Sequence, residues 1–172
     1  MKRNNRGFSL VELIVVIALM GVIAALVAPT LQQLFSSEAR KCSSQIDSLI
    51  SKCKIFSMGR QGDVYVRIYE DNGKIMGEYN ENGLPVSTEQ LGGSRASVSV
   101  TDPDGSSYTI STAKNLYVSF NRATGGLRLF GSTLPASIPT ATISGTAKIE
   151  VTASSKVYTV EIISSTGRHG VS

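Results

Sequence analysis

The amino-acid sequence predicts an α+β fold in which one long N-terminal helix packs on an antiparallel β-sheet domain. The first part of the chain favours a helix, because an unbroken apolar run is followed by apolar residues at spacings of three and four. From Asp63 onward, apolar and polar residues alternate between turn sequences, which is typical of strands. The 172 residues, 41% of them hydrophobic, provide for one membrane segment and one exported domain.

The apolar run Phe8–Ala28 carries a single charged residue, Glu12. A helix of these 21 residues would be about 31 Å long, close to the hydrocarbon thickness of a bilayer, which is about 30 Å. By the positive-inside rule, the preceding Lys2, Arg3 and Arg6 keep the N-terminus in the cytoplasm. We therefore expect a single-pass inner-membrane protein whose polar remainder is exported.

The run is too long for an ordinary secretory signal, whose hydrophobic region spans about 7 to 15 residues. Its start, Arg6-Gly7 followed by Phe8-Ser9-Leu10-Val11-Glu12, resembles the prepilin signature of type IV pilins and type II secretion pseudopilins. The resemblance implies cleavage between Gly7 and Phe8 by a prepilin peptidase, N-methylation of Phe8, and assembly with like subunits and other pilins. It also implies an inner-membrane assembly platform and a lipid bilayer around the helix before assembly. The Walker and dinucleotide glycine patterns are absent from the sequence, and we expect no cofactor.

Glu12 needs a partner, because an ionised carboxylate inside hydrocarbon is costly and rare unless it is paired. The resemblance points to the α-amine of Phe8 in a neighbouring subunit, a contact that would set the axial register during assembly. The alternative is that Glu12, close to the start of the run, snorkels to the headgroups. We expect the pairing.

Pro29 interrupts the helical pattern, and we expect a kink there, since a membrane helix keeps a proline where neighbours satisfy the freed carbonyl. An amphipathic helix is predicted to follow, with an apolar stripe that lasts about three heptads. The stripe consists of Phe35, Ala39, Cys42, Ile46, Leu49, Cys53 and Phe56. Strands are predicted after this helix, so packing of its apolar stripe on a sheet is favoured over a coiled coil. Gly59 and Gly62 mark the end of the helix. The predicted division is a leader at 1–7, a transmembrane and assembly helix at 8–30, its amphipathic continuation at 31–58 and a β-rich globular domain at 59–172.

Cys42 and Cys53 are the only cysteines, and an even count in an exported domain invites a disulfide. Along one helix, however, their Cα atoms would lie about 16 Å apart, whereas a disulfide needs less than about 7 Å. We therefore expect two buried thiols. The alternatives are a broken helix or pairing between chains.

Strand pairs are predicted around turn sequences. Asn72-Gly73 joins 64–69 to 75–79, Asp102-Pro103-Asp104-Gly105 joins 96–100 to 108–110, and Ala123-Thr124-Gly125-Gly126 joins 116–120 to 127–130. A connection rich in Ser, Thr and Pro, 131–145, precedes a last pair at 147–152 and 156–163. The exported domain is therefore predicted to be mostly antiparallel β-structure.

Residues 120–126 and 158–163, with Gly167-Arg168, are similar to the minor pseudopilins of the H type and their pilus-associated relatives. Some of those relatives bind DNA through a C-terminal Gly-Arg-x-Arg, whereas this chain reads Gly167-Arg168-His169-Gly170. Loss of the leader would remove three of the 17 Lys and Arg residues and none of the 13 Asp and Glu residues, leaving a net charge of +1. We do not expect nucleic acid to be a partner, because binding it depends on clustered cations.

The sequence offers no convergence of nucleophile, base and orienting group, so we do not expect an enzyme. His169, the only histidine, lies near the C-terminus, where we expect a frayed tail and no zinc site. Asp102, Asp104 and Ser106 are candidate calcium ligands, but Asp-Pro-Asp-Gly is first of all a turn sequence, and we expect no metal.

The predicted function is that of a structural subunit, a minor pilin or pseudopilin, in a cell-surface or periplasmic filament. One alternative is a single-pass membrane-anchored binding module that never polymerises, and another is a DNA-uptake minor pilin. A permanent anchor has no need of Gly7 before Phe8 or of a buried Glu12, and this favours polymerisation.

Overall fold

A computed structural model describes residues 10–154 and 156–172, and for residues 26–36 it describes the backbone without the side chains. The chain divides into two compact units, Met1–Leu34 and Phe35–Ser172. One helix, α1 (Leu10–Gly59), and ten strands make up the regular structure of the described residues. The strands are β1 (Val64–Asp71), β2 (Lys74–Glu81), β3 (Leu84–Gly92), β4 (Ser97–Thr101), β5 (Ser107–Thr109), β6 (Leu116–Phe120), β7 (Leu127–Gly131), β8 (Thr146–Ala153), β9 (Lys156–Ile163) and β10 (Arg168–Val171).

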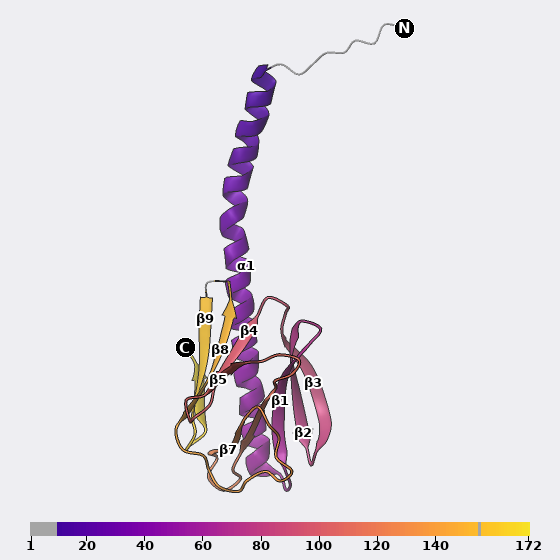
Figure 1. Ribbon diagram of the computed structural model, residues 1–172, viewed down its shortest axis with the longest axis vertical. Helices are drawn as coiled ribbons and strands as arrows, with labels where there is room; N and C mark the ends of the chain where they lie inside the picture. The colour runs from indigo at the N-terminus through magenta and orange to yellow at the C-terminus, as the bar shows by residue number, and fades with distance from the viewer. Residues whose placement is uncertain (1–9, 155) are drawn as a thin grey trace, which may run out of the picture. The chain divides into compact units, whose positions relative to one another are not determined.

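The predicted α+β class is confirmed, with the strands arranged in two antiparallel sheets. One sheet has the order β3-β2-β1-β6-β7 and the other β10-β9-β8-β4-β5. Figure 1 shows β1, β2 and β3 to one side of the lower part of α1 and β8 and β9 to the other. The helix is thus the common packing partner of both sheets in the Phe35–Ser172 unit.

The apolar stripe of this part of α1 enters the core as predicted. Ala39, Cys42, Ile46 and Cys53 have no exposed surface, and Leu49 is 2% exposed. They form one hydrophobic cluster with residues of both sheets. Phe56 is half-buried against that cluster, and the side chain of Phe35 lies outside the described residues.

The helix approaches the first sheet closely at Gly77 in β2. A Cβ atom at this position would lie 2.6 Å from Cδ2 of Leu49 and 2.8 Å from Cδ1 of Leu91. Any larger residue would therefore force the side chains of Leu49 and Leu91 to move. The glycine is part of what allows Leu49 and Leu91 to fill the core.

The predicted hairpins are confirmed. β1 pairs with β2 across a turn in which Asn72 and Gly73 have φ of 49° and 75°, the left-handed values that a two-residue type I′ turn requires. β4 pairs with β5, β6 with β7, and β8 with β9, all antiparallel.

Two strands were not predicted. β3 is an edge strand whose residues from Leu84 to Gln90 are all exposed, so it lacks the apolar alternation that marks a strand in sequence. It also contains Pro85 and two register shifts against β2. β10 is only four residues long and adds to β9. The prediction of a frayed tail around His169 was therefore wrong, because backbone pairing with β9 holds this segment.

Candidate assembly site

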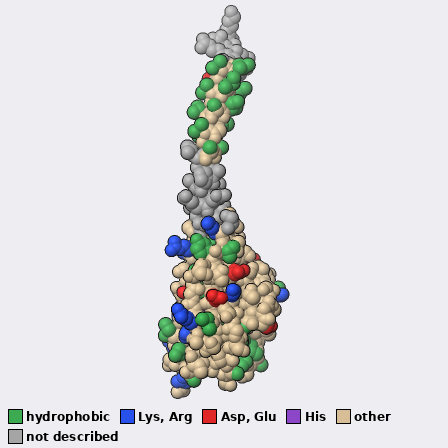
Figure 2. All heavy atoms as spheres, turned by 90° about the vertical axis from the view of Figure 1, so that its left-hand side faces the viewer, with side chains coloured by type: hydrophobic (Ala, Val, Ile, Leu, Met, Phe, Trp, Pro, Cys, Tyr) green, Lys and Arg blue, Asp and Glu red, His purple; other side chains and the backbone are tan. Residues whose placement is uncertain are grey.

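The first part of α1, residues 10–25, has side chains that are all exposed. They are almost entirely apolar, and Leu10, Val11 and Met20 have exposed fractions of 73%, 67% and 64%. Figure 2 shows hydrophobic side chains along the face of this helix that is turned to the viewer. Exposed apolar patches of this extent mark surfaces that another molecule or a membrane covers.

Glu12 lies in the first described turn of α1, within this apolar surface. Its side chain is exposed, and it forms no ion pair with any residue that the structure describes. The described residues thus offer Glu12 no cation. Any partner for the carboxylate has to come from outside the described part of the chain.

The other predicted site residues of this region are less well covered by the structure. Gly7 and Phe8 lie outside the described residues, so cleavage and methylation there stay predictions. At Pro29 the backbone is helical, but its side chain lies outside the described residues, and the kink stays a prediction as well. Within the residues that are described, no helix meets the length and apolarity required of a membrane span.

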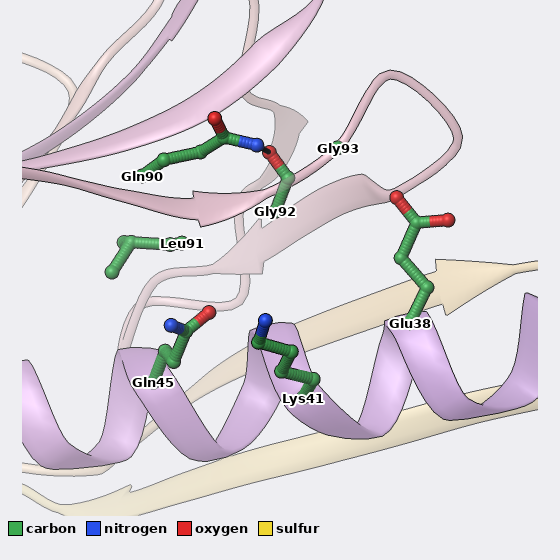
Figure 3. Close-up of a pocket in the computed structure, with 7 residues that line it drawn as sticks. All are labelled: Glu38, Lys41, Gln45, Gln90, Leu91, Gly92 and Gly93. Atoms are coloured by element: carbon green, nitrogen blue, oxygen red, sulfur yellow. Dashed lines mark hydrogen bonds between the residues drawn. The ribbon is translucent and has the colours of Figure 1, made fainter.

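The second part of α1 lines a polar cavity of about 400 Å³, shown in Figure 3. Glu38, Lys41 and Gln45 project from the helix toward the end of β3 and the loop that follows it. On the strand side, the Gln90 side-chain amide donates to the carbonyl oxygen of Gly92 at 3.3 Å. The lining side chains carry one carboxylate, one ammonium and two amides, and none of them is a hydroxyl or thiol nucleophile. The cavity lining thus combines charged and amide groups with the apolar side chain of Leu91.

The two thiols are buried and unpaired, as predicted. Burial raises the pKa of both the Cys42 and the Cys53 thiol from 9.0 to about 12, and the nearby Glu38 carboxylate adds to the effect at Cys42. The Cys53 sulfur lies 3.6 Å from the carbonyl oxygen of Val118 in β6. Both residues fill the helix–sheet interface and are far from the thiolate state that reactivity requires.

His169 connects β10 to α1, a contact that sequence analysis missed. Its Nδ1 donates to the carbonyl oxygen of Gly167 at 2.9 Å, which leaves Nε2 to accept from the Ser51 hydroxyl at 2.8 Å. Asp47 lies one helical turn before Ser51, with its Oδ1 3.9 Å from Nε2. One turn further along, the Lys54 ammonium donates to the carbonyl oxygens of Thr166 and Gly167, both at 3.0 Å. Asp47, Ser51 and Lys54 thus form a polar stripe on α1 that contacts the β9–β10 hairpin. In the sequence, the only indication of this contact is that the three residues lie three or four positions apart.

Hydrogen bonds from Ser106 to Asp104 lie within the turn between β4 and β5. The Ser106 hydroxyl donates to Asp104 at 2.7 Å and the Ser106 backbone N–H to the same carboxylate at 2.9 Å. These bonds lower the pKa of Asp104, whereas burial raises the pKa of Asp102. Among the described residues, no group of three or more His, Cys, Asp or Glu side chains is placed to hold a metal ion.

Comparison with known protein families gives one match, the prokaryotic N-terminal methylation motif, at residues 2–28. Comparisons with curated proteins and with solved structures gave no match. The matched residues contain Gly7, Phe8 and Glu12, the positions that the sequence singled out. They also contain all of the exposed apolar residues 10–25 of α1. The chain therefore carries the N-terminal signature of type IV pilins and pseudopilins.

Proposed function

We propose that this chain is a structural subunit, a pilin or pseudopilin, that polymerises through the first part of α1. A prepilin peptidase would cleave between Gly7 and Phe8 and the new Phe8 amine would be methylated. The subunit would act by assembly rather than by catalysis. The observation that supports this proposal most strongly is the coincidence of the methylation motif with the exposed apolar helix of residues 10–25.

The proposal assigns a role to each part of the chain. Residues 1–7 are the leader, 8–30 the membrane and assembly segment with a bend at Pro29, 31–58 the helix of the core, and 59–172 the exported domain. Before assembly the subunit is a single-pass inner-membrane protein with a cytoplasmic N-terminus. After assembly the apolar segment lies among the same segments of neighbouring subunits.

Glu12 has a defined part in this assembly. In a bilayer its carboxylate would be costly, and in the filament the Phe8 ammonium of a neighbour would pair with it. That pairing is available only when a second subunit arrives. The charge pair would therefore fix the axial position of each added subunit.

Mass spectrometry of the N-terminus tests the processing step. Protein from membranes and from sheared filaments should begin at N-methylated Phe8. Gly7→Ala should still be cleaved in part, whereas Gly7→Leu should remain uncleaved, because the residue before the scissile bond has to be small. Finding intact Met1 in assembled filaments would contradict the proposal.

A further inference from the structure

The strand layer β1–β3 and the hairpins β8–β10 of the same domain have opposite charge balances. Residues 64–92 carry five carboxylates and two cations, whereas residues 146–171 carry three cations and two carboxylates. Most of the acidic side chains in the first group, including Glu70, Glu78 and Glu89, belong to none of the ion pairs between described residues. The two groups of strands therefore have net charges of opposite sign, −3 and +1.

On the acidic side, β3 is an open edge of its sheet. Leu84 is 70% exposed and Val86 58%, and the exposed Glu89 follows on the same strand. Val86 is the extra residue at one of the two register shifts, between the pairs Tyr79↔Ser87 and Asn80↔Pro85. Such a bulge and a proline discourage pairing of two identical edges, so we do not expect β3 to pair with β3 of another copy. We call Leu84, Val86 and Glu89 the β3 surface.

On the basic side, the β9–β10 hairpin has a hollow of about 240 Å³, lined by Glu161, Ile163, Arg168, His169 and Gly170. Ile163 and Arg168 are direct partners across the hairpin, and Ile163 is 43% exposed. Glu161 is engaged by Lys148 at 3.5 Å, whereas Arg168 forms no ion pair with a described residue. The β9–β10 hollow thus has the apolar side chain of Ile163 beside the guanidinium of Arg168, which is in no ion pair with a described residue.

From these two surfaces we infer that the β3 surface of one subunit docks into the β9–β10 hollow of the next copy of this chain. Val86 enters the hollow against Ile163, and Glu89 pairs with Arg168 of the neighbour. Because the two surfaces differ, the contact is heterologous and repeats head to tail, which generates an open helical array instead of a closed dimer. The inference rests on the proposed filament function and specifies which faces of the exported domains meet.

Charge reversal at the two surfaces tests the inference. Glu89→Arg and Arg168→Glu should each lower the amount of protein in sheared filaments about tenfold relative to the membrane pool, since each places like charges opposite one another. The double variant should recover most of the native yield. Asp71→Arg and Lys156→Glu are matched controls, because both residues are exposed and lie outside the two surfaces. Both controls should assemble normally, and thermal unfolding should show every variant folded.

Chemical crosslinking gives a second, independent readout. Val86→Cys and Ile163→Cys combined in one chain should give ladders of crosslinked subunits with a short bifunctional thiol reagent, because the native thiols are buried and do not compete. Val86→Cys alone should give no ladder. Native filament yields in the single reversals, together with no ladder, would overturn the inference while leaving the filament function intact. If the native chain is missing from filaments altogether, both are overturned.

Discussion

The two parts of α1 have the same backbone conformation and opposite surroundings. In residues 10–25 every side chain is exposed although nearly all are apolar, whereas in residues 37–59 the apolar residues at helical spacing are buried beneath two sheets. The second part finds its packing partner within the chain. Among the described residues the first part has no such partner, and its apolar side chains are exposed. Helix formation alone therefore does not distinguish the two parts; the source of the packing partner does.

The largest expected effect is a difference in thiol alkylation rate between buried and exposed positions in the second part of α1. Burial raises the pKa of Cys53 from 9.0 to about 12, so at pH 8 the thiolate fraction falls by about three orders of magnitude. We expect Cys42 and Cys53 to resist alkylation in the folded, detergent-extracted protein and to react fully in denaturant, which intact mass would show. Ser48→Cys, at an exposed position of the same helix, should react at once. An internal disulfide, or rapid labelling of the native thiols, would contradict the continuous buried helix.

Truncation of a large side chain should also distinguish the two parts. Leu49→Ala removes a side chain that is 2% exposed and should lower the free energy of unfolding of the exported domain by about 2 to 5 kcal/mol. Ile17→Ala makes a comparable truncation at a residue that is 59% exposed, and should change the unfolding of that domain by less than about 0.5 kcal/mol. Thermal or chemical denaturation in detergent measures both. Equal destabilisation by the two variants would show that residues 10–25 are already packed within the chain.

A smaller effect is expected where the second part of α1 holds β10. His169→Ala removes the acceptor for the Ser51 hydroxyl and should destabilise the domain by about 1 to 2 kcal/mol, while Ser51→Ala should cost about 1 kcal/mol. Because both changes remove the same contact, the double variant should be no worse than His169→Ala, a coupling that denaturation of all three proteins would reveal. Fully additive losses would mean that the two side chains act independently.

Local patterns predicted the elements whose signals are short-range. Asn72-Gly73 identified the first hairpin, and the spacing of Ala39, Ile46 and Cys53 identified the buried face of the helix. These signals are local because a two-residue turn and a helical stripe are each defined within a few residues.

The features that were missed depend on contacts between distant residues. β3 is stabilised by pairing with β2 and not by burial, so Leu84 and Val86 gave no alternation to detect. His169 is ordered by a helix residue 118 positions earlier in the chain. The division of the strands into two sheets likewise follows from the β1–β6 and β4–β8 pairings, which no local pattern encodes. For the candidate site, the sequence identified Gly7, Phe8 and Glu12, but the β3 surface and the β9–β10 hollow required the fold.

The proposed filament function depends most directly on Glu12 acting in assembly and not in folding. Glu12→Gln keeps the shape and removes the charge, and Glu12→Leu also removes the polar group, so membrane insertion and the stability of the exported domain should be native in both. Filament assembly should fall by about two or three orders of magnitude, since a buried charge pair that loses one member costs about 3 to 5 kcal/mol. The measurement is the ratio of each variant in sheared filaments to that in the membrane, when it replaces the native protein. A native ratio for Glu12→Leu would contradict the pairing and favour a carboxylate that only reaches the headgroups.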